Sequence, residues 1–150
     1  AIEKRGKVKA IKYYIDASYP QFDGSWTDFR ETNQTFELST REAVADSTPD
    51  PKDDETRDQN WSYDQSFQLF RPAAQAISVV TSSYSFTGGA HGNSGVSGAL
   101  IDLRSGLMLA PSEVFVSGDG WRAELREMVG HEVATVLRMG LEIYAGEAEG

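Results

Sequence analysis

The sequence contains no cysteine, which excludes a disulfide framework, a thiolate metal site and a cysteine nucleophile. It also lacks an apolar run approaching the roughly 20 residues of a membrane-spanning helix, so we expect no membrane insertion within this chain. Basic residues are few, because 14 Lys and Arg stand against 23 Asp and Glu, for a net charge of −9. Nucleic acid and anionic lipid surfaces attract clustered basic residues and are therefore disfavoured as partners, whereas a cationic partner is favoured.

The composition is that of a folded domain. The chain has 150 residues, of which 39 % are hydrophobic and 11 % aromatic. This length is sufficient for a sizeable core without metal or disulfide support. We therefore expect a single domain over residues 1–150.

Hydrophobic periodicity predicts the elements. Alternation of apolar and polar residues predicts strands over 7–16, 61–71, 76–86 and 96–103. Helical spacing predicts two amphipathic helices, over 25–45 with a cap at Asp23 or Ser25 and over 120–139, and a single helical turn over 110–115. The predicted fold class is α+β, with a mainly antiparallel β-sheet packed against the two amphipathic helices.

Three local features refine this layout. The polar stretch 46–60 contains two prolines and no glycine, so it predicts a long solvated loop and not a calcium loop. A change of phase within 76–86 predicts a bulge near 81–83. The short connection between 61–71 and 76–86 predicts an antiparallel pair. The predicted core is Trp26, Phe29, Phe36, Trp61, Phe67, Leu69, Ile77, Val79, Leu125, Val129 and Val136.

A glycine-rich turn with a histidine is the most distinctive stretch. Gly88-Gly89-Ala90-His91-Gly92 lies between two predicted strands and holds one of the two histidines. Such a run indicates unusual backbone torsions, or the close approach of another group to the backbone. The candidate ligand-binding or structural residues are Gly88, Gly89, His91 and Gly92, and the structural and recognition roles are compatible.

Each catalytic pattern that we tested lacks a component. His131-Glu132 opens like a zinc-hydrolase motif, but Thr135 stands at the second ligand position. The glycine turn has no P-loop ending and leads into a strand, so it does not indicate a nucleotide site. We therefore expect no metal, no other cofactor and no enzymatic activity.

A small hydrolase centred on His91 is the alternative function. Ser85, Ser94 and Ser97 surround His91, and Asp102 follows downstream, but no nucleophile elbow is present. The acids do not have a spacing that indicates a glycosidase pair. A purely structural domain of a larger protein is the remaining alternative.

The motifs resemble a known family. Tyr84 to Gly92, the following strand into Asp102-Leu103-Arg104-Ser105-Gly106, and the element from Leu109 to Phe115 resemble the RsiV/PdaC-like family of bacterial extracytoplasmic domains. Tyr19-Pro20 after the first strand also matches the start of the family pattern. The resemblance covers about residues 8–138, and the family's final strands are not seen after Leu141.

The resemblance implies a non-catalytic envelope module. In one branch of the family the domain binds lysozyme outside the cell, and in another the deacetylase chemistry belongs to a separate metal-dependent domain. The implied ligand is a lysozyme-like protein or a peptidoglycan-related cell-wall glycan. The implied location is the periplasm or the cell surface, and a lipid anchor on an N-terminus removed before Ala1 is one arrangement that it allows.

Overall fold

The computed structural model describes residues 1–50, 52, 59–114, 120, 122–124 and 126–131. The chain divides into two compact units, Ala1–Leu109 and Ala110–Gly150, and each is described by itself.

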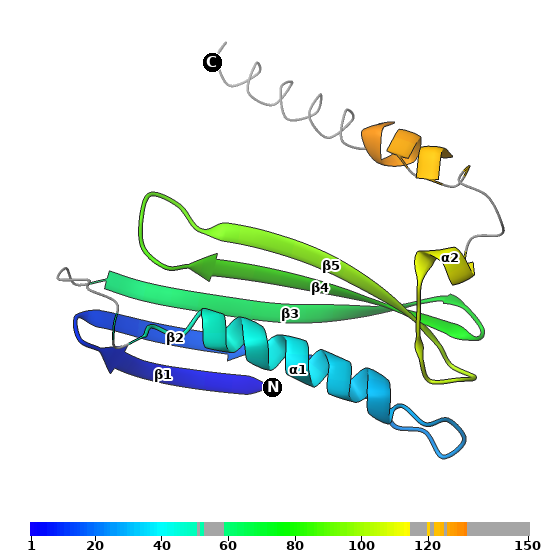
Figure 1. Ribbon diagram of the computed structural model, residues 1–150, viewed down its shortest axis with the longest axis horizontal. Helices are drawn as coiled ribbons and strands as arrows, with labels where there is room; N and C mark the ends of the chain where they lie inside the picture. Colours follow the sequence, from blue (N-terminus) through cyan, green and yellow to red (C-terminus); the bar gives the residue numbers. More distant parts are fainter. Residues whose placement is uncertain (51, 53–58, 115–119, 121, 125, 132–150) are drawn as a thin grey trace, which may run out of the picture. The chain divides into compact units, whose positions relative to one another are not determined.

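The first unit is a six-stranded sheet with one long helix (Figure 1). The strands are β1 (Ile2–Val8), β2 (Ile11–Ala17), β3 (Gln59–Ala73), β4 (Ala76–Phe86), β5 (Asn93–Asp102) and β6 (Met108–Leu109). They lie in sequence order across the sheet, and all neighbours are antiparallel except β2 and β3, which are parallel. The helix α1 (Arg30–Asp46) makes the crossover between these two strands. The α+β class is confirmed, but the sheet is mixed.

The first predicted strand is two strands. The range 7–16 contains the turn of a hairpin, since β1 and β2 pair from Ile2 opposite Ala17 to Val8 opposite Ile11. Lys9 adopts φ 50° at this turn. A lysine carries no turn preference of the kind that Asn-Gly has, so the sequence pattern hid the reversal.

The helix begins later than predicted. α1 starts at Arg30 after Phe29, with no side-chain cap, so neither Asp23 nor Ser25 caps it. The preceding segment is held in another way, because the Thr27 hydroxyl donates to the carbonyl of Leu103 at 2.8 Å. Trp26 is consequently 96 % exposed, and its prediction as a core residue is wrong.

The helix α1 lies against one face of the sheet (Figure 1), and the core residues lie between the two. One cluster joins the helix to β2 and β3 through Ile15, Ala17, Val44 and Tyr63. A second joins the start of the helix to β4 and β5 through Phe29, Val79 and Ile101, with Phe36, Phe67 and Ile77 packed against it. The predicted core positions Phe29 and Val79 are confirmed as buried, and the last three are partly buried.

Other predicted core residues are not buried. Leu69 is 49 % exposed, and β4 is the one strand beside it among the described residues, because the pairing of β2 with β3 ends at Gln65. Trp61 is only partly buried. Val129 is 54 % exposed in the second unit, while Leu125 and Val136 lie outside the described residues.

The hairpin of β3 and β4 is confirmed, but its irregularity lies elsewhere. The register runs without interruption from Ser62 opposite Phe86 to Phe70 opposite Ser78, so there is no bulge near 81–83. The shift falls between Phe70 and Ala73. Pro72 lies there, and a proline has no N–H for the ladder.

The predicted turn 104–106 joins β5 to β6 and fastens α1 to the sheet. Gly106 has φ 76° and donates its N–H to the Asp102 carbonyl at 2.8 Å. The buried Thr32 hydroxyl of α1 donates to the Gly106 carbonyl at 2.6 Å. The Asp102 carboxylate accepts the Arg104 N–H at 3.0 Å and the Ser105 hydroxyl at 3.2 Å, which closes the turn.

The second unit begins with α2 (Pro111–Val114), as the sequence predicts for 110–115. Gly120, 122–124 and 126–131 are helical, which agrees with the start of the predicted helix 120–139. Its remainder lies outside the described residues, as does most of the predicted loop 46–60, so the packing of a second helix on the sheet stays a prediction.

Candidate functional site

The backbone conformation of the turn 87–92 requires glycine at two positions. Gly88 and Gly89 have φ angles of 90° and 100°, which side-chain-bearing residues rarely adopt. A Cβ on Gly88 would also overlap the side-chain amide of Gln59, at the start of β3. Gln59 is itself held, because its Oε1 accepts the indole N–H of Trp61 at 3.2 Å. The backbone of the turn therefore lies against the Gln59 side chain of β3 at Gly88, where the positive φ and the close contact both favour glycine.

Gly92 is needed for a different reason. A Cβ there would overlap the ring and hydroxyl of Tyr84, and φ at Gly92 is not positive. Tyr84 lies opposite Ser94 across the β4–β5 ladder, and its ring reaches along the strand to cover Gly92. Tyr84 is 43 % exposed, so its side chain contacts the turn at Gly92 and also forms part of the open surface of the sheet.

His91 is not explained by the fold in this way. Its ring is exposed, and Nδ1 lies 3.1 Å from the carbonyl oxygen of the neighbouring Gly92. That contact spans one residue, so it ties the ring to the turn but does not connect the turn to another element. The glycines of the motif are structural, whereas the imidazole is presented to solvent.

The serine-hydrolase arrangement is not assembled. Asp102 lies at the opposite end of β5 from His91, and its carboxylate serves the β5–β6 turn. The backbone N–H of Arg104 is the main cause that lowers the pKa of Asp102. In the described part of the chain, no serine or carboxylate lies at hydrogen-bond distance from the His91 ring.

A row of acids crosses the open face of the sheet, which α1 does not cover. Asp64 of β3 lies directly between Asp16 of β2 and Tyr84 of β4, and Glu3 of β1 extends the row beyond Asp16. Asp16 accepts the Tyr14 hydroxyl at 3.4 Å. Burial raises the pKa of Tyr14, and the charge of Asp16 raises it further. Asp16 and Asp64 are both exposed.

These side chains line a polar depression of about 370 Å³. Its lining includes Asp16, Ser18, Asp64, Ser66, Ser82 and Tyr84. It offers carboxylates and hydroxyls, which suit cationic or hydroxyl-rich ligands. Tyr84 belongs both to this depression and to the support of Gly92, so the turn and the acidic surface form one continuous candidate site.

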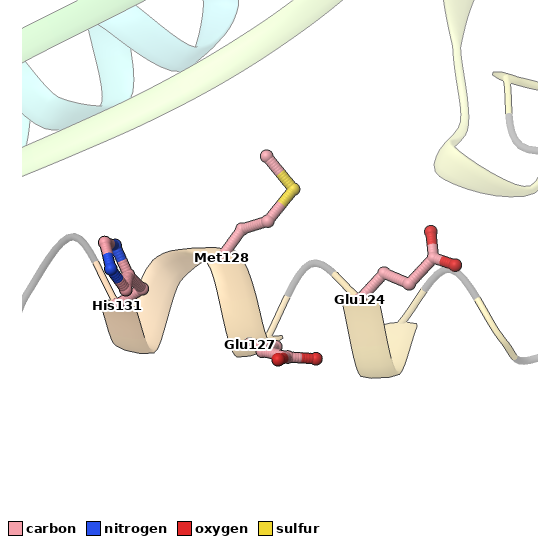
Figure 2. Close-up of a pocket in the computed structure, with 4 residues that line it drawn as sticks. All are labelled: Glu124, Glu127, Met128 and His131. Atoms are coloured by element: carbon pink, nitrogen blue, oxygen red, sulfur yellow. The ribbon is translucent and has the colours of Figure 1, made fainter.

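A second hollow lies in the other unit. Figure 2 shows Glu124, Glu127, Met128 and His131 projecting from a single helical stretch, and they line a hollow of about 490 Å³. All four come from one element, and Met128 is 66 % exposed. This is a groove on a helix surface, and the described residues do not close it with a second element.

The row of acids on the open face was not predicted from the sequence. Asp16 and Asp64 are polar positions of separate strands, and only the register of a parallel pair brings them together. The alternation of apolar and polar residues in each strand does indicate that Asp16 and Asp64 lie on the polar faces of their strands. Their alignment requires the crossover through α1, which the sequence pattern did not predict.

A metal-binding cluster and a membrane-spanning helix are both absent from the described residues. Among them, no group of three or more His, Asp or Glu side chains is arranged to hold a metal ion. No helix within this part of the chain is long and apolar enough to cross a membrane.

Comparison with known proteins identifies relatives of the fold. The family model described as deacetylase PdaC matches residues 7–94, more than half of the chain. A solved structure of a DUF3298 family protein from Pseudomonas aeruginosa is similar, with a TM-score of 0.51 and 18 % sequence identity. The similarity covers 91 % of this chain but only 65 % of that one, so the chain spans less than two thirds of that protein's length. No curated protein matches the sequence.

Proposed function

The chain belongs to the deacetylase PdaC family, and we propose that it is a non-catalytic, extracytoplasmic ligand-binding domain of a bacterial envelope protein. Its ligand is a lysozyme-like cationic protein, with a peptidoglycan-related glycan as the second candidate. The binding surface consists of the turn 87–92 and the adjoining acidic depression. The observation that carries the proposal is the exposed His91 at the tip of a turn whose glycines are all needed structurally.

Charge supports a cationic protein as the ligand. The chain carries a net charge of −9, which raises the rate of encounter with a basic partner. Asp16 and Asp64 lie opposite each other on adjacent strands, although like charges in this position destabilise a sheet. A basic side chain placed between the two carboxylates would relieve that repulsion on binding.

The same geometry argues against a hydrolase. A pair of catalytic carboxyls needs a cleft that sets them across a scissile bond, whereas Asp16 and Asp64 are exposed and lie directly beside each other on adjacent strands. A histidine that acts as a general base needs a nucleophile within hydrogen-bond reach, and His91 contacts the carbonyl of Gly92. Binding therefore uses these residues as they stand, whereas catalysis would require them to be rearranged.

Isothermal titration calorimetry with a lysozyme and with soluble peptidoglycan fragments tests the proposal. We expect lysozyme to bind, and the affinity to fall with rising salt because the contact is electrostatic. His91→Ala should weaken binding by about tenfold or more, with an unchanged melting temperature. His131→Ala is the matched control, since it removes the other histidine and should leave the affinity unchanged.

Two results would contradict the proposal. If neither lysozyme nor peptidoglycan fragments bind at high concentration, the ligand assignment is wrong. If lysozyme binds equally well to the wild type and to His91→Ala, the turn is not part of the binding surface.

A further inference from the structure

The two edges of the sheet differ in how they are protected. β1 forms one edge, and it carries Glu3, Lys4, Arg5 and Lys7 within a strand of seven residues. Arg5 pairs with Glu3 at 2.6 Å and lies 5.0 Å above the ring of Tyr14. Charged side chains on an edge strand discourage the addition of another strand. The β1 edge is therefore protected against the addition of another strand.

The opposite edge is open for most of its length. β6 pairs only with Leu100 and Ile101 of β5. From Asn93 to Ala99, β4 is the one strand paired with β5 in the part of the chain that the structure describes. This segment contains no charged residue and no proline, and Val96 is 77 % exposed. Its outward backbone donors and acceptors form a template about 20 Å long for an added strand.

Two glycines within this open segment are not required by the fold. Gly95 and Gly98 do not have positive φ angles. A Cβ on Gly98 would meet only the Val79 carbonyl oxygen at 3.8 Å, an ordinary contact. A Cβ on Gly95 would meet the movable hydroxyl of Ser83 at 2.9 Å. Glycine inside a strand weakens it, and it often marks a place where another backbone or ligand approaches closely.

We propose that the open edge, defined as Asn93–Ala99 of β5, binds an extended, basic peptide segment of a partner protein as an additional β-strand. The backbone ladder would supply the affinity, and Gly95 and Gly98 would leave room for large side chains of the peptide at neighbouring positions. The net charge of −9 favours basic side chains in the segment. The proposal concerns the edge of the sheet, so it stands or falls separately from lysozyme binding at the turn.

A second copy of this chain is the less favoured occupant. Each copy carries a net charge of −9, so two copies repel each other. Pairing of two short edge segments also buries far less than the roughly 1,200–2,000 Å² of a stable interface. A peptide strand can bind weakly and reversibly without meeting that requirement.

The first test uses a synthetic blocked peptide in which lysine alternates with valine and tyrosine. Two N-methylated versions carry methyl groups on alternate residues, so that each blocks the N–H donors on one edge of the peptide. We expect the parent peptide to bind, one methylated version to lose binding, and the other to retain it. Equal binding of both methylated versions, or no binding of the parent, would overturn the proposal.

The second test uses Gly98→Val. The substitution should raise the melting temperature, because valine favours an extended backbone and meets no obstacle there. It should nevertheless weaken binding of the peptide by about tenfold, since it fills the space beside the ladder. Ser62→Val, on the same face of the sheet but in β3 at a position paired on both sides with β2 and β4, is the control and should leave peptide binding unchanged. A Gly98→Val protein that binds as well as the wild type counts against the proposal.

Hydrogen exchange of the protein alone provides an independent check. The amides of Asn93–Ala99 that point away from β4 should exchange rapidly and become protected when the peptide is added. Protection without peptide would mean that the edge is already covered, and the proposal would fail. Sedimentation would then show whether the cover is a second copy or another part of the same chain.

Discussion

Alanine substitution in the turn 87–92 separates backbone strain from side-chain contact. At Gly89, φ is 100° and a new Cβ would have no neighbouring atom within 4 Å. The cost of Gly89→Ala is therefore conformational only, and for a left-handed residue it is about 1–2 kcal/mol. This is a measurable share of the roughly 5–15 kcal/mol that stabilises a typical domain.

Gly88→Ala should cost more than Gly89→Ala. The φ angle of 90° imposes a similar conformational penalty, and the new Cβ would also displace the Gln59 side chain. Displacement breaks the hydrogen bond between Gln59 and Trp61, which contributes about 0.5–1.5 kcal/mol. We expect a total loss of about 2–3 kcal/mol for Gly88→Ala.

Urea unfolding followed by tryptophan fluorescence measures both losses. A D-alanine at position 89, introduced by peptide ligation, is the control, because its preferred φ is positive and it should restore stability. The reasoning would be refuted if Gly89→Ala caused no measurable loss, or if the two L-alanine variants were equally stable.

Three further predictions address the helix anchor, the acidic row and pH. Thr32→Val should lower the free energy of unfolding in urea by about 1–3 kcal/mol, because it leaves the buried Gly106 carbonyl without its donor. Asp64→Asn should raise the melting temperature slightly by removing repulsion from Asp16, and should weaken lysozyme binding in calorimetry; a fall in melting temperature would contradict this. Hydrogen bonds from Arg30 lower the pKa of Asp28 to about 2, so this exposed carboxylate stabilises the fold above about pH 4. The stability deficit of Asp28→Asn, measured by urea unfolding, should therefore shrink as pH falls from about 4 to 2, and a deficit that does not change with pH would exclude this linkage.

The local sequence pattern was sufficient to predict the elements whose structure depends mainly on nearby residues. The alternation of residues 61–71 and 76–86 predicted β3 and β4 and their antiparallel pairing, which the register confirms. The apolar face of α1 was also predicted correctly from Phe29 to Val44, since both are buried. These features depend on spacing within a short window, which the sequence carries directly.

Prediction failed where tertiary contacts override local preference. The apolar spacing extended the helix back to Trp26, but the hydroxyl of Thr27 bonds to Leu103, far along the chain, and the segment turns away. The hairpin at Lys9 has no turn signature in its residues. The parallel pairing of β2 and β3, which aligns Asp16 with Asp64, depends on how α1 crosses the sheet.

The β5–β6 turn and the β4–β5 turn differ in how many of their residues the fold uses. In the β5–β6 turn every distinctive residue is used by the fold, since Asp102 closes the turn and Gly106 receives the Thr32 hydroxyl. In the β4–β5 turn the glycines are used in the same way, but His91 is not. The described contacts of the His91 ring stay within its own turn, which leaves the imidazole accessible to the ligand that we propose.

The same reasoning connects His91 with Asp64 and Gly98. Like charges opposite each other and a strand glycine with room for a side chain both lower stability, and the imidazole of His91 is exposed and contacts the carbonyl of the neighbouring Gly92. If these residues serve binding, their replacement by Asn, Val or Ala should leave stability unchanged or raise it while binding falls. His91→Ala and Asp64→Asn should affect lysozyme binding, whereas Gly98→Val should affect only the peptide, because Gly98 lies on the edge strand β5 and does not line the acidic depression. A loss of stability in all three variants would instead assign these residues to the fold and leave the binding surface without support.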